Sequence, residues 1–222
     1  SYQPLIDIQD GSLMGFEALL RWNHSEIGNI PPNKFIPIAE ESGLIIPITV
    51  WILKETTRQI AAWQQIGPEY KDLVVSVNIS GKHLSNDDLI ADVREALDLS
   101  KIDPYCLKLE ITESAAMENA EHTIDMLNRL KLLGVQLSID DFGTGYSSLS
   151  YLHNFPLQKG KIDRSFLEDI GSHRPLTLLR GVARLSADLG MSVVVEGIET
   201  NEQLELISAE GTVTEAQGFL FS

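Results

Sequence analysis

The sequence is poor in cysteine and in positive charge. Its 222 residues include one cysteine, Cys106, so no disulfide can form within the chain. Seventeen lysines and arginines stand against 32 aspartates and glutamates, which gives a formal net charge of −15. This balance argues against a groove that follows a long nucleic-acid backbone, and we expect no DNA partner. A small phosphate ligand remains compatible with it, because bound metal ions can supply positive charge.

The sequence also lacks long hydrophobic runs. The longest, 44–53, contains Pro47 and Thr49 and is well short of the roughly 20 residues that a membrane-spanning helix needs. It shows no secretory leader and no initiating methionine. We therefore expect a domain cut from a longer polypeptide, itself without membrane contact, that is cytoplasmic or the cytoplasmic part of a membrane-anchored protein. Length and composition predict a single domain over 1–222.

Apolar runs rich in Val, Ile and Leu alternate with amphipathic segments along the chain. Strands are predicted at 2–8, 13–20, 73–79, 107–111, 135–140, 158–162, 192–196 and 216–220. Helices are predicted at 48–66, 87–99, 120–133, 147–153 and 176–189, and from the capping box of Thr200 and Gln203 onward. This alternation is typical of a largely parallel sheet covered by helices.

The number of predicted strands favours a closed barrel. Eight strands alternating with helices fit an α/β fold of the (β/α)₈ or TIM-barrel type. Asp10-Gly11 between the first two strands is a hairpin signal, so the first strand should be antiparallel to the rest, which modifies that fold. An open doubly wound sheet is the competing architecture. It is disfavoured because no G-x-G-x-x-G loop follows an early strand.

Polar residues occur near the carboxyl ends of most predicted strands, although strands buried on both faces should be apolar throughout. These residues are Glu17, Asn78, Glu110, Asp140, Lys161, Glu196 and Gln217. From Asn78 onward, successive members lie about one strand-plus-helix unit apart. A single acid at a strand end is usually a solvated residue or a helix cap. A set with this spacing meets at one mouth of a barrel and indicates a functional site.

The acidic character of this mouth points to metal ions. Crowded carboxylates repel one another and raise their own pKa values. Mg²⁺ or Mn²⁺ would relieve this, because both prefer carboxylate and amide oxygens, and no Cys or His lies among these strand ends. The adjacent acids Asp140 and Asp141 can serve two metals, a pair that activates water for attack at phosphorus. Lys161 would neutralise charge on the phosphoryl oxygens. These grounds indicate phosphoester hydrolysis and leave enolisation with a lysine base open.

The ordered motifs resemble the EAL-domain family of cyclic di-GMP phosphodiesterases over essentially the whole chain. The motifs are Tyr2-Gln3-Pro4, Glu17-Ala18-Leu19-Leu20-Arg21-Trp22, Phe35-Ile36-Pro37-Ile38-Ala39-Glu40, Asn78-Ile79-Ser80, Glu110-Ile111-Thr112-Glu113, Asp140 to Gly145, Lys161-Ile162-Asp163, Glu196-Gly197-Ile198-Glu199 and Gln217-Gly218-Phe219. The resemblance implies a modified barrel with an antiparallel first strand. It also implies hydrolysis of one phosphodiester bond of cyclic di-GMP, which yields linear pGpG in bacterial second-messenger signalling.

The same resemblance implies roles for individual residues. It places the first of two Mg²⁺ or Mn²⁺ ions on Glu17, Asn78, Glu110 and Asp140, and the second on Asp140 and Asp141. It implies catalytic roles for Lys161, Glu196, Asp141 and Glu113: the first two would orient or activate water, and Glu113 would hold the loop 141–145. Gln3, Arg21, Glu199 and Gln217 would line the ligand, with Arg21 on a phosphate, and Asp163 would support Lys161.

Partners and an alternative function are implied by the same resemblance. Relatives that keep the fold but have lost acids act as cyclic di-GMP receptors or protein-interaction modules, which is the alternative here. The retained acids, with Asn78 and Lys161, favour an active enzyme. The resemblance further implies a homodimer, formed through helices beside the 141–145 loop, and covalently linked GGDEF or sensor domains.

Overall fold

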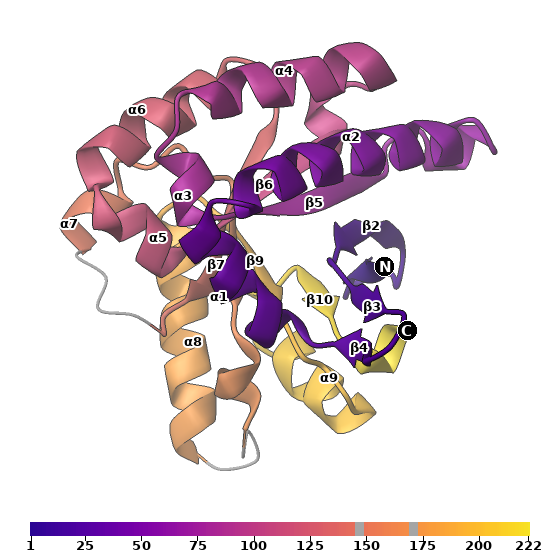
Figure 1. The fold of residues 1–222 in the computed structure, drawn as a ribbon. Coiled ribbons are helices and arrows are strands. Elements are labelled where there is room, and N and C mark those ends of the chain that lie inside the picture. Colours follow the sequence, from indigo (N-terminus) through magenta and orange to yellow (C-terminus); the bar gives the residue numbers. More distant parts are fainter. Residues whose placement is uncertain (145–148, 169–172) are drawn as a thin grey trace.

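The computed structural model describes residues 1–144, 149–168 and 173–222, and eight of their strands close into a barrel (Figure 1). Around the barrel the order is β1-β10-β9-β8-β7-β6-β5-β2. These strands are β1 (Tyr2–Asp7), β2 (Leu13–Ala18), β5 (Val74–Ile79), β6 (Leu107–Thr112), β7 (Gln136–Phe142), β8 (Lys159–Ile162), β9 (Ser192–Val195) and β10 (Glu215–Gln217). Strand β1 is antiparallel to both neighbours, whereas the other neighbouring pairs are parallel. The predicted modified barrel is confirmed, and the open sheet is wrong.

The antiparallel first strand arises from the turn at Asp10-Gly11. Gly11 has a φ of 72°, a left-handed conformation that glycine adopts without a Cβ clash. Its N–H donates to the carbonyl of Asp7, and Asp10 Oδ1 accepts from the N–H of Ser12 at 2.8 Å. These bonds reverse the chain, so β2 returns alongside β1 and continues the parallel part of the sheet next to β5.

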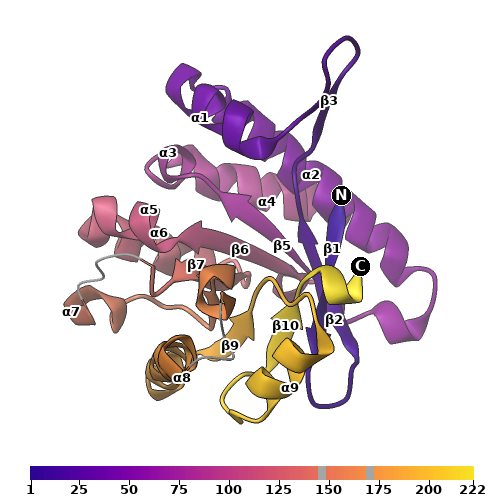
Figure 2. The ribbon, with the colours of Figure 1, turned by 90° about the horizontal axis from the view of Figure 1, so that it is seen from below.

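Helices cover the outside of the barrel (Figure 2). They are α1 (Pro32–Ser42), α2 (Ile45–Gln64), α3 (Gly81–Leu84), α4 (Asp88–Ser100), α5 (Glu113–Glu118), α6 (Ala120–Lys131), α7 (Leu149–Leu152), α8 (His173–Asp188) and α9 (Asn201–Ser208), with 3₁₀ turns η1 (Pro68–Tyr70), η2 (Pro104–Cys106), η3 (Arg164–Leu167) and η4 (Phe219–Phe221). The predicted capping box of Thr200 and Gln203 opens α9. In the described ranges no single helix is long and apolar enough to cross a membrane; α1 and α2 meet the criteria only when joined across a 117° bend.

The apolar core lies between the strands and these helices. In β5, Val75, Val77 and Ile79 are buried and belong to one cluster with helix residues such as Leu53 and Leu89. Burial of each large aliphatic side chain contributes about 1.5–3 kcal/mol. Because strand side chains alternate between two faces, the intervening residues face the interior of the barrel. At these interior positions the chain carries polar residues, and they form the candidate site.

Several elements differ from the sequence-based expectation. The helices α1, α3 and α5 and the small hairpin of β3 (Trp22–His24) and β4 (Gly28–Ile30) were not predicted. Helix α1 buries only Phe35 and Ala39 and contains Pro37, so it has a weak apolar period. The last strand was expected at 216–220 but ends at Gln217, and η4 comes after it. A Cβ on Gly218 would lie 2.1 Å from the carbonyl oxygen of Ile198, so the chain passes close to the segment after β9 before it turns.

Candidate active site

The ammonium of Lys161 lies at the centre of four carboxylates inside the barrel. Lys161 Nζ is 2.5 Å from Glu196 Oε1, 2.7 Å from Glu110 Oε2, 3.2 Å from Glu17 Oε2 and 3.4 Å from Asp140 Oδ1. The lysine is 2% exposed. Each of the five residues lies on a different strand or directly after one, so the cluster exists only because the barrel is closed. The sequence prediction that these residues meet at one mouth is confirmed for this set.

Strand register explains why the side chains meet. Asn78 on β5 pairs with Glu110 on β6, and Gln3 on β1 pairs with Glu17 on β2. Paired residues on adjacent strands point to the same face of a sheet, here the interior. Since the carboxyl ends of parallel strands lie at one mouth of a barrel, their polar side chains converge there.

Amide side chains hold Glu17 in place. Glu17 Oε1 accepts a hydrogen bond from Asn78 Nδ2 at 2.7 Å, and Oε2 accepts one from Gln217 Nε2 at 2.6 Å. The same Gln217 nitrogen donates to Gln3 Oε1 at 3.0 Å. Burial acts to raise the pKa of Glu17, but the charge of Lys161 and these amide bonds outweigh it and lower that pKa. Glu17 is therefore held as a carboxylate.

The other carboxylates of the cluster are poorly compensated. Burial, with the neighbouring carboxylates, raises the pKa values of Glu110 and Asp140 despite the opposing charge of Lys161. It raises the pKa of Glu196 to about 8. The surrounding acids more than offset the burial of Lys161 and hold its pKa well above the usual value. One ammonium thus serves four acids, and the site carries excess negative charge that a further cation would neutralise.

The donor set suits Mg²⁺ or Mn²⁺. Its carboxylate and amide oxygens are the ligands that these hard cations prefer. In the described ranges, however, no group of three or more acidic, histidine or cysteine side chains is arranged as a metal site. In the cluster, the Lys161 ammonium lies between Glu17, Glu110 and Asp140. Metal binding would require this ammonium to move aside.

Asp141 lies near the carboxyl end of β7, and Glu113, the first residue of α5, lies beside it. Asp141 has a φ of 55°, a left-handed conformation that is uncommon for a residue with a side chain. The hydroxyl of Thr144 donates to the Asp141 carbonyl at 2.7 Å, and the N–H of Gly143 donates to Glu113 Oε2 at 2.8 Å. The buried carboxylate of Glu113 thus contacts the predicted loop at Gly143, while Gly145 lies outside the described residues.

A pocket of about 250 Å³ opens above the cluster. Among the predicted site residues, those that line it are Gln3, Glu17, Arg21, Asp140, Glu196, Glu199 and Gln217. Asn78, Glu110, Glu113, Asp141 and Lys161 do not line it. The pocket also includes Arg164 and Phe219, which were not predicted as site residues. The available signal was their position: Phe219 belongs to the motif Gln217-Gly218-Phe219, and Arg164 directly follows Lys161-Ile162-Asp163.

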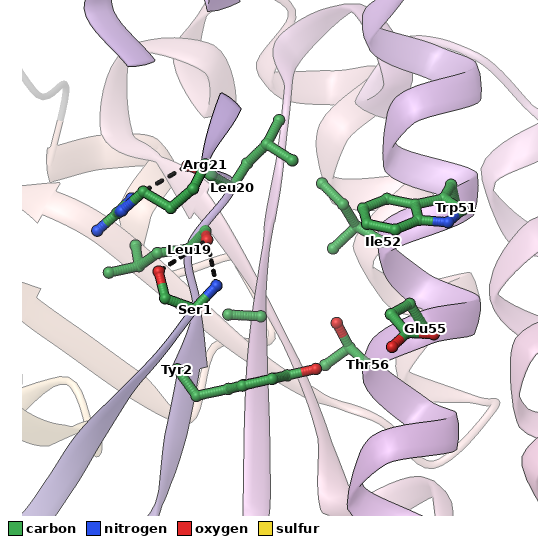
Figure 3. A pocket seen from close by; sticks show the side chains of 10 residues that line it. Ser1, Tyr2, Leu19, Leu20, Arg21, Trp51, Ile52, Glu55 and Thr56 are labelled. Carbon is green, nitrogen blue, oxygen red and sulfur yellow. Dashed lines mark hydrogen bonds between the residues drawn. The ribbon is translucent and has the colours of Figure 1, made fainter. Parts of the chain in front are cut away.

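Arg21 lines both this pocket and a neighbouring one. The second pocket, about 230 Å³, lies between the ends of β1 and β2 and helix α2 (Figure 3). Arg21 is exposed, and its Nη1 donates to the carbonyl of Leu20 at 3.0 Å. Figure 3 shows its guanidinium turned away from Trp51 and Ile52 of α2. The group is therefore available to a ligand above the barrel mouth.

Comparisons with known proteins agree with this geometry. A sequence model of the family described as "EAL domain" matches residues 1–222. The chain is 41% identical over 222 residues to cyclic di-GMP phosphodiesterase NbdA of Pseudomonas aeruginosa, covering 100% of this chain and 28% of the relative. It is 40% identical over 220 residues to the bifunctional diguanylate cyclase/cyclic di-GMP phosphodiesterase MucR of the same organism, covering 99% and 32%. The chain thus spans about a third of the length of these relatives.

Solved structures show the same fold. A structure of the PaMucR phosphodiesterase in complex with c-di-GMP superposes with a TM-score of 0.95 at 39% identity, covering 100% of this chain and 89% of that one. The EAL enzyme Bd1971, in its form bound to cAMP and cyclic di-GMP, gives a TM-score of 0.92 at 35% identity, covering 100% and 60%.

Proposed function

The chain belongs to the EAL domain family, and we propose that it is a phosphodiesterase that hydrolyses cyclic di-GMP to linear pGpG in bacterial signalling. The observation that carries this proposal is the cluster in which Lys161 contacts Glu17, Glu110, Asp140 and Glu196. A protein that only bound the nucleotide would not require four buried acids around one lysine, since uncompensated buried charge destabilises the fold.

Two divalent ions, Mg²⁺ or Mn²⁺, are part of the proposal. Glu17, Asn78, Glu110 and Asp140 would hold the first ion, and Asp140 with Asp141 the second. When bound, such a pair lowers the pKa of water and neutralises charge on phosphoryl oxygens. The excess negative charge of the cluster supports this assignment, because the ions would replace carboxylate repulsion by attraction.

The chain's own residues orient the reactants in this proposal. Glu196 accepts a hydrogen bond from the attacking water and takes up its proton. Burial raises the pKa of this carboxyl group to about 8, which increases its affinity for a proton. Lys161 donates to a phosphoryl oxygen on which charge develops. Glu113 acts as a positioning residue through its bond to the N–H of Gly143.

The pocket residues would hold the substrate. Arg21 is assigned to a phosphate, because its guanidinium is exposed beside the pocket. Gln3, Glu199 and Gln217 would contact the remainder of the nucleotide. We further propose a homodimer and covalently linked GGDEF or sensor domains; relatives such as MucR, a bifunctional cyclase and phosphodiesterase, are much longer than this chain.

The test is incubation of the purified domain with cyclic di-GMP and Mg²⁺ or Mn²⁺, with product analysis by chromatography. We expect pGpG to accumulate with metal and to be absent with EDTA. A domain that leaves cyclic di-GMP intact under both conditions would contradict the proposed activity.

One observation favours a second candidate function, that of a cyclic di-GMP receptor. The Lys161 ammonium occupies the space between the acids that would otherwise share a cation. If the lysine kept this position, the pocket would bind the nucleotide without cleaving it. Calorimetric binding of cyclic di-GMP in the presence of Mn²⁺, with no pGpG formed, would identify this function.

A further inference from the structure

Two arginines, Arg21 and Arg164, line the pocket without an acidic partner among the described residues. On the surface, Arg58, Arg129, Arg180 and Arg184 each pair with a carboxylate. Arg164, in contrast, forms no ion pair within the part of the chain that the structure describes, and the same is true of Arg21. Arg94, on α4, likewise forms no ion pair with a described residue, but it does not line this pocket. An unpaired guanidinium beside an acidic cluster, in a chain of net charge −15, is available to an anionic ligand.

Arg164 is held at the pocket wall by local backbone geometry. It opens the 3₁₀ turn η3, whose N-cap is Asp163; Asp163 Oδ1 accepts a hydrogen bond from the N–H of Ser165 at 2.9 Å. After the next strand along the barrel, Gly197 has a φ of 73°, and a Cβ there would lie 2.4 Å from the Cβ of Arg164. The absence of a side chain at Gly197 thus leaves the space that Arg164 occupies.

The two arginines approach from different walls. Arg21 comes after β2 and Arg164 after β8, and β1, β10 and β9 separate these strands in the barrel. The carboxylates that surround Lys161 already neutralise its charge. A ligand with two separated anionic groups would therefore find one guanidinium at each wall of this pocket.

We propose that Arg164 binds the phosphate of the cyclic dinucleotide that is not cleaved and thereby fixes which phosphate lies over the acidic cluster. The proposal rests on the proposed function, because a cyclic dinucleotide carries two phosphodiester groups and only one is hydrolysed. A guanidinium offers two parallel donors to a phosphate, which fixes orientation as well as supplying charge. Arg164 is in this sense a substrate-binding residue that selects a ligand with two phosphodiesters over a ligand with one.

The test compares Arg164→Gln and Arg164→Lys with the wild-type domain. We expect Arg164→Gln to raise the KM for cyclic di-GMP by about tenfold, because one charge-assisted contact is lost. The change in kcat should be smaller. The dissociation constant, measured by calorimetry in EDTA so that no turnover occurs, should rise in parallel. Arg164→Lys should restore most of the affinity, since it keeps the charge. The KM for bis(p-nitrophenyl) phosphate, which has one phosphodiester, should rise less.

Arg184→Gln is the matched control, because it removes the same charge from an exposed position on α8. The proposal is overturned if Arg164→Gln binds cyclic di-GMP with the same dissociation constant as Arg184→Gln. It is equally overturned if Arg164→Gln raises the KM values for cyclic di-GMP and bis(p-nitrophenyl) phosphate by the same factor. A further outcome would also overturn it: Arg164→Lys loses as much affinity for cyclic di-GMP as Arg164→Gln, while both variants bind cyclic di-AMP as tightly as the wild type does. That result would assign Arg164 to the guanine base, because cyclic di-AMP has the same two phosphodiesters and lacks guanine. Wild-type protein that neither binds nor cleaves cyclic di-GMP would contradict the proposed function itself.

Discussion

A lysine as deeply buried as Lys161 keeps its charge only where acids surround it. Desolvation alone would lower the pKa of such a group, yet the carboxylates of Glu110, Glu196, Glu17 and Asp140 reverse the direction. The dependence is mutual, because the positive charge of the lysine opposes the effect of burial on the pKa of each acid, although burial is outweighed only at Glu17. At the scale of the residue, the site is one charge network, and single substitutions act on all of its members.

Glu17→Gln tests this network with little change in shape. We expect pGpG formation to fall below detection, because the variant loses a carboxylate proposed to hold metal while the neighbouring amides remain. Product is measured by chromatography, and the fold is checked by circular dichroism. Glu205→Gln, an exposed position on α9, is the control. Turnover at the wild-type rate in Glu17→Gln would refute the metal assignment.

At the scale of the element, the site depends on the residues at the carboxyl end of each strand and just beyond it. Strand β7 passes through a left-handed residue, Asp141, near its end, and η3 begins two residues after β8. A left-handed conformation at a residue with a side chain costs about 1–3 kcal/mol and persists where surrounding bonds fix it. The bonds of Gly143 and Thr144 provide that restraint. The geometry of the acids on β7 is thus set in part by contacts outside the strand.

Glu113 provides the test at this scale. We expect Glu113→Ala to lower kcat by about 10–100-fold with little change in KM, because the chain at Gly143 loses its acceptor while the pocket lining is unchanged. Glu113→Gln retains an oxygen that can accept from the Gly143 N–H and should recover a large part of kcat. Steady-state kinetics on cyclic di-GMP measure both values. Equal losses of activity in the two variants would argue against a positioning role.

At the scale of the whole molecule, closure of the barrel brings together residues from both ends of the sequence. Gln3 on β1 and Gln217 on β10 share a hydrogen bond although 214 positions separate them. The closed sheet has no exposed edge, and its apolar outer face is covered by helices. Its interior, in contrast, concentrates negative charge at one mouth. The fold therefore stabilises an arrangement that would be unfavourable in isolation.

Metal ions should stabilise the whole domain. If Mn²⁺ or Mg²⁺ binds the folded cluster and not the unfolded chain, the melting temperature rises with metal concentration, by an amount equivalent to about 2.7 kcal/mol at one hundred times the dissociation constant. Thermal unfolding with and without metal measures the shift. Glu17→Gln should reduce it and Glu205→Gln should not. An equal shift in all three proteins would indicate binding elsewhere.

Much of the fold was predictable, because buried strands and amphipathic helices leave local periods in the sequence. All eight barrel strands were placed, and Asp10-Gly11 predicted the reversal of the first. The elements that were missed have weak local signals. Helix α1 buries only Phe35 and Ala39. Strands β3 and β4 have three residues each, and helices α3 and α5 have four and six. The end of β10 depends on the approach of Gly218 to Ile198, a contact between distant segments.

The sequence by itself determined the family, the barrel and the polar residues at the strand ends, because each of these is encoded by residue type and spacing along the chain. Only the tertiary structure decided that Lys161 lies among the acids, that Glu113 reaches Gly143, and that Arg164 lies against Gly197. These are contacts between residues on different strands and turns. Their distances and pKa shifts depend on barrel closure and burial, which no local pattern in a sequence specifies.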